Sequence, residues 1–256
     1  LATQVGRYAH AKQYKRMRAA IKTLRTRVGR VQRDVQRQLA KLPEQVQTKG
    51  HDLLQRVGRI LTQKTKDKNK LYALHAPEVE CISKGKARNP YEFGVKVTLA
   101  TTLKEGLVVG MRSMPGNPYD GHTLDETIEQ VGILANQRPR TVMVDKGYKG
   151  AEVEGVQILR SGQRRGVTRT MKAMIKRRSA IEPTIGHMKS DGRLDRNPLK
   201  GALGDALHAV LCGAGHNIRL LLSLLRLFVA HLRAIVLAWL GRSASGYTRQ
   251  VALAAA

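Results

Sequence analysis

The carboxylate of Glu182 stands among cations, with Arg178 four residues before it and Lys189 seven residues after it. Offsets of four and seven residues fall on one face of a continuous helix, because about 3.6 residues make a turn. A carboxylate on such a stripe can bind a metal ion while the neighbouring cations hold phosphate. The spacing therefore indicates a candidate site for phosphate chemistry.

The same stretch can also be interpreted as the start of a helix. Ser179 and Glu182 have the spacing of a capping box, and Pro183 suits a first helical turn. Arg178 would then lie outside the helix, and only Glu182 and Lys189 would share a face. A glutamate fixed in a first turn remains a suitable metal ligand.

A second acid, Asp145, ends the short apolar run 141–145, which is typical of a buried strand. Ligands of open α/β sheets collect at the carboxyl ends of strands. Gly147 and Gly150 permit a tight turn that leaves the carboxylate exposed. The alternative is that Asp145 only caps a turn or helix.

Asp145 and Glu182 together suggest a metal site. Mg²⁺ needs only one or two protein carboxylates in addition to substrate phosphate oxygens. Two such ions can clamp the attacking and leaving oxygens of a phosphodiester. The two acids, in a basic protein, have the chemistry for that reaction.

The charge of the chain points to a polyanionic partner. Its 256 residues include 46 Lys and Arg against 19 Asp and Glu, which gives a formal net charge of +27. Nucleic acid is the usual partner of such a surplus, and an anionic membrane surface or a ribosomal or chromatin-like role are the alternatives. Only 4% of the residues are aromatic, so duplex backbone contact is favoured over the stacking of single-stranded bases.

The two cysteines, Cys81 and Cys212, lie far apart in the sequence. They form no CxxC pair, so a zinc site and a disulfide framework are both disfavoured. A reduced, cytoplasmic compartment is expected.

The N-terminal part is predicted to be helical from residue 8 to 63. Leu42–Pro43 is expected to break this run, with a second, shorter helix over 53–61. The pattern predicts a basic antiparallel helical pair, which is either a solvated face or a DNA-facing arm.

Alternating residues then predict strands, and a helix is expected from Thr123. The strands are expected over 78–83, 91–100, 107–114, 141–145 and 156–159, and the second and third should form an antiparallel hairpin. Later residues read as helix over 170–190 and 203–240, with a loose tail from Gly241. The fold class is α/β, a small mixed sheet covered by helices.

The apolar region 203–240 is interrupted by Arg219, Arg226 and Arg233, which are spaced by seven and share one face. A membrane span needs about 18 or more apolar residues. We therefore expect packed amphipathic helices and no membrane.

The chain from about residue 71 to 227 resembles the catalytic region of DDE-type transposases of bacterial insertion sequences. Four segments carry the resemblance in the family's order: Tyr91-x-Phe-Gly-x-Lys96, Asn117-x-x-Asp120, Val144-Asp145-Lys-Gly-Tyr-Lys-Gly150 and Arg178-x3-Glu182-x6-Lys189. They resemble, respectively, the family's second-strand entry, its short loop motif, its second-acid motif and the signature around its third acid.

The resemblance implies a ribonuclease-H-like fold that cuts and joins element ends with two Mg²⁺ ions, for which Mn²⁺ can substitute. Asp145 and Glu182 would be the metal ligands. The cations expected to contact double-stranded DNA are Arg178, Lys189, Lys146, Lys149 and Arg177. Synapsis of two ends implies a possible homodimer.

The sequence departs from the family pattern in two places. The tyrosine of the third-acid signature falls at Ile175, and no strand with the family's first aspartate is found between Leu1 and Leu71. We expect that strand and its aspartate to lie upstream of Leu1, so that this chain is N-terminally truncated and inactive alone.

Three segments are expected on this interpretation. Residues 1–70 would be a basic helical insertion between the first and second strands, 71–228 the catalytic region and 229–256 a C-terminal helix and tail. The alternative function is a non-catalytic DNA-binding remnant that uses the basic helices.

Overall fold

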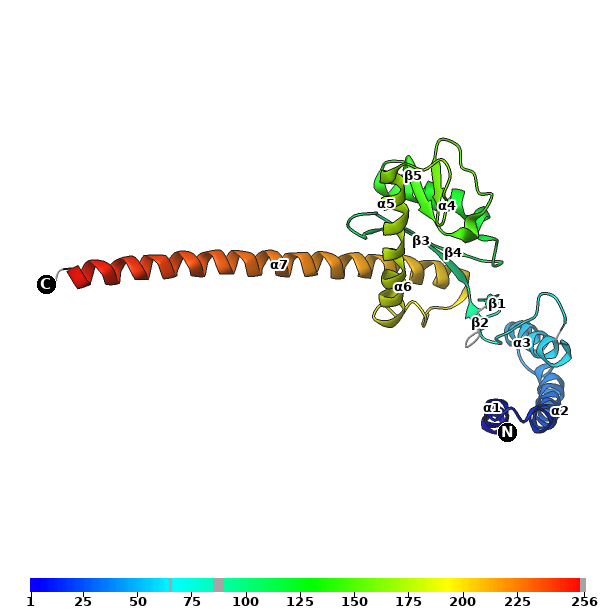
Figure 1. Cartoon of the computed structure of the whole chain (residues 1–256). Helices are drawn as coiled ribbons and strands as arrows, with labels where there is room; N and C mark the ends of the chain where they lie inside the picture. The colour runs from blue at the N-terminus through cyan, green and yellow to red at the C-terminus, as the bar shows by residue number, and fades with distance from the viewer. Residues whose placement is uncertain (65, 85–89, 254–256) are drawn as a thin grey trace. The chain divides into compact units, whose positions relative to one another are not determined.

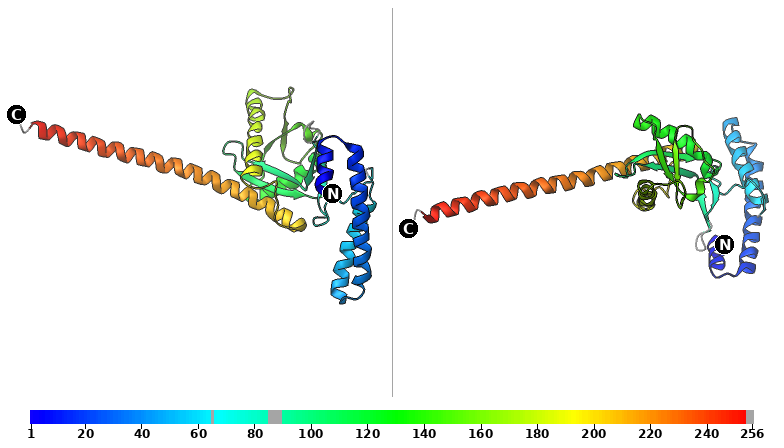
Figure 2. Two further views of the ribbon diagram at one scale, coloured as in Figure 1. Left: turned by 90° about the horizontal axis from the view of Figure 1, so that it is seen from below. Right: turned by 45° about the horizontal axis from the view of Figure 1, so that its top comes forward.

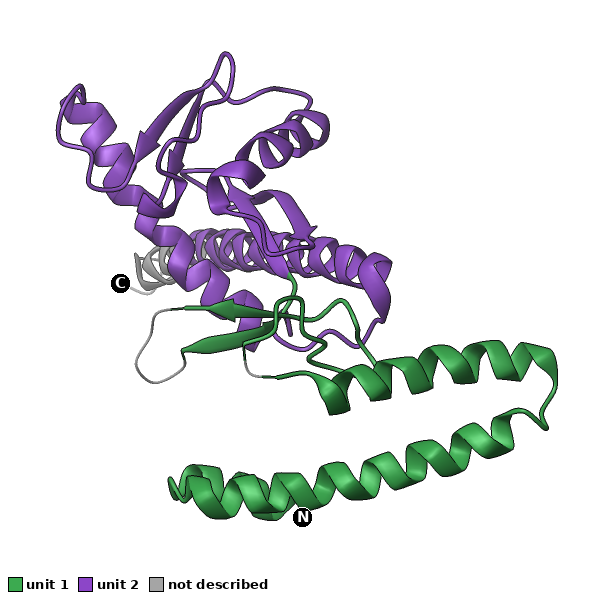
Figure 3. Ribbon diagram, turned by 90° about the vertical axis from the view of Figure 1, so that its right-hand side faces the viewer, with its two compact units in different colours: residues 1–95 green, residues 96–256 purple. Residues whose placement is uncertain are grey.

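The computed structural model describes residues 1–64, 66–84 and 90–253, with side chains as far as residue 240 (Figure 1). The chain divides into two compact units, residues 1–95 and 96–256 (Figure 3). The first holds the N-terminal helices and one strand pair, and the second holds all the candidate site residues. The expected segment boundaries at 70 and 228 remain a prediction.

The first unit begins with helices α1 (Ala2–His10), α2 (Tyr14–Leu39) and α3 (Glu44–Thr62). Pro43 is the N-cap of α3, which confirms the expected break. Helix α3 is longer than the 53–61 predicted from its apolar residues. The prediction began too late because the first turns of the helix are polar and show no apolar period.

Two contacts along α2 and α3 confirm the antiparallel pair. The Arg25 guanidinium donates to the carbonyl of Leu61. At the other end Leu39, which is buried, packs on Gly50, where a Cβ would lie 2.5 Å from its Cδ1. Gly50 therefore allows the close approach of the two helices.

The alternating segment 91–100 is not one strand, which corrects the prediction. Strand β2 (Tyr91–Gly94) pairs antiparallel with β1 (Glu80–Ser83), and a new strand begins at Lys96. Gly94 has a φ of 152°, a conformation that L side chains rarely adopt. The chain changes sheets at this glycine.

Strands β3 (Lys96–Thr101) and β4 (Val108–Met114) form the expected antiparallel hairpin in the second unit. Helix α4 (Leu124–Ala135), entered through the 3₁₀ turn η1 (Asp120–Thr123), packs on one face of it. Its buried residues share one stripe: Leu124, Thr127, Ile128 and Val131.

The other face of the hairpin packs on the later helices. A buried cluster joins β4 to helices α6 and α7 through Met111, Met188, Ala209 and Cys212. The hairpin is therefore covered on both faces, and this fixes the helices that carry the candidate site.

Strands β5 (Thr141–Val144) and β6 (Gln157–Arg160) are parallel. Val144 packs with Leu124 and Ile128 of α4, so one helix contacts both strand pairs of this unit. Among the described residues the strands form three separate pairs. The mixed α/β class is confirmed, whereas the single small sheet predicted from the sequence is not formed.

The basic helix predicted over 170–190 is formed by α5 (Arg169–Arg177), a 3₁₀ turn η3 (Arg178–Ala180) and α6 (Ile181–Ser190). The 3₁₀ turn joins the two helices without a break in direction, as Figure 1 shows.

The last element is one helix, α7 (Gly201–Leu253), and it extends as a rod in both views of Figure 2. Its early turns pack on β4, and the Asn217 amide bonds both the N–H (2.7 Å) and the C=O (2.8 Å) of Val108. The predicted loose tail from Gly241 is wrong, because the helical backbone continues to Leu253.

The expectation that the apolar helix is packed is wrong beyond its early turns. Every side chain from Leu221 to Leu240 is exposed. The segment Gly201–Leu240 is long and apolar enough to cross a membrane by length and composition alone, with a mean hydropathy of 2.0 over its best window. Arg226 and Arg233 would each cost about 3 kcal/mol near a bilayer centre.

Candidate active site

Arg178 links the two predicted acids. Its Nη2 lies 3.5 Å from Oδ2 of Asp145 and 3.3 Å from Oε1 of Glu182. The two carboxylate oxygens can be no further apart than the sum of these distances, which is below the roughly 10 Å that a shared two-metal site tolerates. The structure thus brings together three residues that the sequence placed in two separate motifs.

The helical path explains this geometry. Because α5, η3 and α6 run on continuously, Arg178 and Glu182 lie one turn apart and pair as an i,i+4 couple. The capping-box interpretation is wrong, since Ser179 donates its hydroxyl to the carbonyl of Lys176 and α6 has no side-chain cap. Pro183 does lie in the first turn of α6, as predicted.

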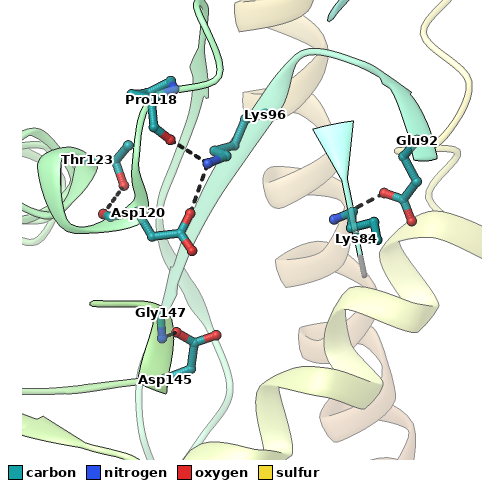
Figure 4. A network of polar contacts seen from close by, with 8 residues as sticks. All are labelled: Lys84, Glu92, Lys96, Pro118, Asp120, Thr123, Asp145 and Gly147. Carbon is teal, nitrogen blue, oxygen red and sulfur yellow. Dashed lines mark hydrogen bonds and ion pairs between the residues drawn. The ribbon is translucent and has the colours of Figure 1, made fainter. Parts of the chain in front are cut away.

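Asp145 follows directly after β5, as the strand-end argument requires. Its Oδ1 accepts a hydrogen bond from the N–H of Gly147 (2.8 Å), so the side chain also caps the short turn η2 (Lys146–Tyr148) (Figure 4). The cap interpretation and the site interpretation are therefore compatible. The cap fixes one carboxylate oxygen, and the second faces Arg178.

A third carboxylate, that of Asp120, lies beside Asp145. A Cβ on Gly147 would be 2.8 Å from Oδ2 of Asp120 and 3.0 Å from Oδ1 of Asp145, so a side chain here would displace at least one carboxylate. Lys96 at the start of β3 donates to Oδ1 of Asp120 (3.0 Å) and to the carbonyl of Pro118 (Figure 4).

The sequence predicted Asp120 only as part of a loop motif with Asn117. Asn117 has a φ of 43°, a left-handed turn conformation that asparagine tolerates, and it shapes the loop. The sequence signal that could have found the Asp120 contact was Gly147, a glycine two residues after a candidate ligand.

The other predicted DNA contacts are placed as follows. Arg177 donates through Nε and Nη2 to the carbonyls of Leu103 and Lys104, each at 2.7 Å, so its guanidinium holds α5 against the β3–β4 turn. Lys146 lies against Gly162, and the carbonyl of Lys149 accepts from the Tyr119 hydroxyl. Lys189 is half-buried on α6.

Tyr148 is a site neighbour that the sequence did not predict as functional. Burial raises the pKa of its hydroxyl above the ordinary value of 10.0, and the carboxylates of Asp120 and Asp145 raise the pKa further. The carboxylates and this phenol therefore share one electrostatic environment.

Tyr148→Phe is expected to reduce the loss of stability at alkaline pH. Because the folded-state pKa is raised, the neutral phenol favours folding fully below pH 10.0, and this contribution is lost as pH rises through the folded pKa. Urea unfolding at neutral pH and above pH 10 measures the difference. Tyr14→Phe, at a residue that is 52% exposed, is the control; an equal change in both variants would contradict the assignment.

No group of three or more His, Cys, Asp or Glu residues that could hold a metal ion occurs within the described part of the chain. The donor chemistry nevertheless fits a hard cation. Asp120 and Asp145 each place a carboxylate oxygen beside Gly147, and Glu182, with a side chain 61% exposed, pairs with the arginine that also contacts Asp145. Carboxylates are the ligands that Mg²⁺ takes in proteins.

Acids at a strand end and on a helix, in a protein with a formal net charge of +27, are a candidate site for chemistry on nucleic-acid phosphates. The sequence model of the family described as "Transposase DDE domain" matches residues 60–218. The chain belongs to this transposase DDE domain family.

No curated protein and no solved structure shows significant similarity to the chain. The family implies a DNA substrate and DNA cleavage in transposition, and its members generally use divalent metal ions. They are typically soluble cytoplasmic proteins.

Proposed function

We propose that the chain is the catalytic region of an insertion-sequence transposase that hydrolyses phosphodiesters and transfers strands at element ends with Mg²⁺. The observation that carries the proposal is the Arg178 bridge between Asp145 and Glu182. Arg178 is half-buried and pairs with both acids, so the two carboxylates lie within reach of one site.

We propose Asp145 and Glu182 as ligands of two Mg²⁺ ions, with Asp120 as the neighbouring carboxylate across Gly147. When bound, the ions would stabilise the attacking and leaving oxygens of the phosphodiester. Arg178, whose side chain is 22% exposed, neutralises both acids and can turn to a phosphate oxygen when a cation takes that role.

The element order supports a ribonuclease-H-like fold that includes one further strand. Side chains of Asn217 and Gln130 bond the backbone of β4 at Val108 and Met111, so they occupy that edge. Strands β3 and β5 each have one strand partner within the described residues. A strand with the family's first acid would fit between them and end near Asp145.

The same proposal covers the partners. Lys146, Lys149, Lys189, Arg177 and Arg178 would face double-stranded element ends and target DNA, and residues 1–70 would add a basic arm. A homodimer would hold two ends in synapsis, and the cytoplasm is the compartment.

A non-catalytic DNA-binding remnant is the alternative. The absence of a metal-binding group of three within the described residues favours it, as does the lack of a first-strand aspartate in the sequence. Such a protein would bind duplex DNA through its +27 charge and cut nothing.

Nicking of a duplex that carries a terminal repeat tests the proposal. The chain is compared with a protein whose reading frame is extended upstream of the Leu1 codon, each with Mg²⁺ or Mn²⁺. We expect the extended protein to nick the duplex and the shorter chain to be much slower. Tight DNA binding without nicking by either protein would support the remnant.

A further inference from the structure

A basic cavity of about 580 Å³ lies between α7 and the turn that follows α6, apart from the carboxylate site. Three arginines line it, Arg193 and Arg196 from the turn and Arg219 from α7, together with His208 and Asn197. No acid lines it. The lining therefore has the charge of an anion site.

Backbone geometry fixes two of these arginines. Arg193 has a φ of 56°, and its carbonyl accepts a hydrogen bond from Nε2 of His208 (3.0 Å). Arg219 lies over two glycines: a Cβ on Gly192 would be 3.1 Å from its Nη2, and one on Gly215 would be 3.8 Å from its Nη1. The absence of side chains at both glycines leaves room for the guanidinium.

Asp191 and Asp205, two acids of the flanking helix ends, already have partners, and the exposed Asp195 lies in the turn between Arg193 and Arg196. Asp191 bonds Nδ1 of His187 (2.9 Å) and the Ser190 hydroxyl (2.8 Å). Oδ1 of Asp205 accepts from the Asn197 amide (2.7 Å), and its other oxygen is buried. Neither carboxylate lines the cavity, whose described lining carries three arginines and therefore a net positive charge.

The one cysteine in the lining, Cys212, is not activated as a nucleophile. The Cys212 thiol lies 3.6 Å from Nε2 of His208, but that nitrogen donates to the carbonyl of Arg193 and cannot act as the base. The thiol donates to the carbonyl of Gly192 (3.2 Å), and burial raises its pKa. The lining therefore offers positive charge and no activated nucleophile.

We propose that this cavity binds backbone phosphates of the duplex DNA that flanks the cleavage site, an inference that rests on the proposed function for its ligand. Glu182 and the cavity lie at opposite ends of α6. Eight residues from Glu182 to Ser190 span about 12 Å at 1.5 Å per residue. Duplex rises about 3.4 Å per base pair, so on a duplex that runs along α6 the cavity would hold phosphates three or four base pairs from the reacting one.

The test measures DNA affinity as a function of salt in EDTA, where no cleavage occurs. The variant R193Q/R196Q removes two charges from the cavity. Each lost phosphate contact lowers the slope of log affinity against log salt by about 0.9, so we expect a decrease of about two, and about tenfold weaker binding. Hydroxyl-radical footprints should lose protection three or four base pairs from the cleavage position.

The matched control is R226Q/R233Q. It also removes two arginines, but these are exposed residues of α7 that lie beyond Arg219 and outside the cavity. We expect it to change the slope by less than half as much. Equal changes in the two variants, or an unchanged slope in R193Q/R196Q, would overturn the cavity assignment. The binding assay needs no catalysis. A protein that fails to nick DNA can therefore still show the expected change in slope, and failure of the proposed function is distinguished from failure of the cavity assignment.

Discussion

Glu182→Gln is expected to lower the rate of metal-dependent nicking by about a hundredfold or more, with duplex affinity unchanged or slightly higher. A metal that polarises a phosphoryl oxygen contributes several kcal/mol to transition-state stabilisation, and about 1.4 kcal/mol corresponds to a tenfold rate. The amide keeps the shape of the side chain and removes the charge that would hold the ion. Single-turnover rates of the upstream-extended protein measure the effect.

The matched control is Glu154→Gln, which makes the same charge change at an exposed residue of the same unit. We expect its nicking rate to equal that of the unaltered protein. Mn²⁺ affinity, measured by calorimetry, should fall in Glu182→Gln only. Equal nicking by both variants would remove Glu182 from the mechanism, whatever the affinity for DNA.

The placement of the two proposed metal ligands was predictable because its signals are local. Asp145 ends a short apolar strand, and Arg178 and Glu182 are four residues apart on a helix. A strand end and a helical face are both properties of a few consecutive residues, so the periodicity of the sequence sets them. The antiparallel helical pair and the β3–β4 hairpin were predictable for the same reason.

The contacts that the sequence did not reveal depend on chain segments that are far apart. Asp120 meets Asp145 because Gly147 has no side chain to separate them, and apart from that glycine no spacing pattern in the sequence predicts the approach. The 91–100 run alternates throughout, yet Gly94 turns the backbone and its halves join different sheets. The packing expected for α7 was inferred from its apolar residues. An apolar sequence indicates that a helix face favours burial, but it does not show which other segment of the chain would cover that face.

Gly147→Ala tests whether Asp120 and Asp145 act at one site. The added Cβ would lie 2.8 Å from one carboxylate and 3.0 Å from the other, so at least one must move. We expect a fall of at least tenfold in nicking rate, because misplacement of a reacting group by about 1 Å can cost far more than that. Stability should fall by about 1–3 kcal/mol, the usual cost of overpacking.

The control is Gly186→Ala on α6, where a Cβ would meet no atom within 4 Å. An alanine there should stabilise the helix by up to about 1 kcal/mol and leave nicking unchanged. Adding Asp120→Ala to Gly147→Ala removes one side of the clash. A contact of this kind gives a coupling of about 0.5–3 kcal/mol in a double-mutant cycle. Strictly additive losses in urea unfolding would show that the two carboxylates do not share the space above Gly147.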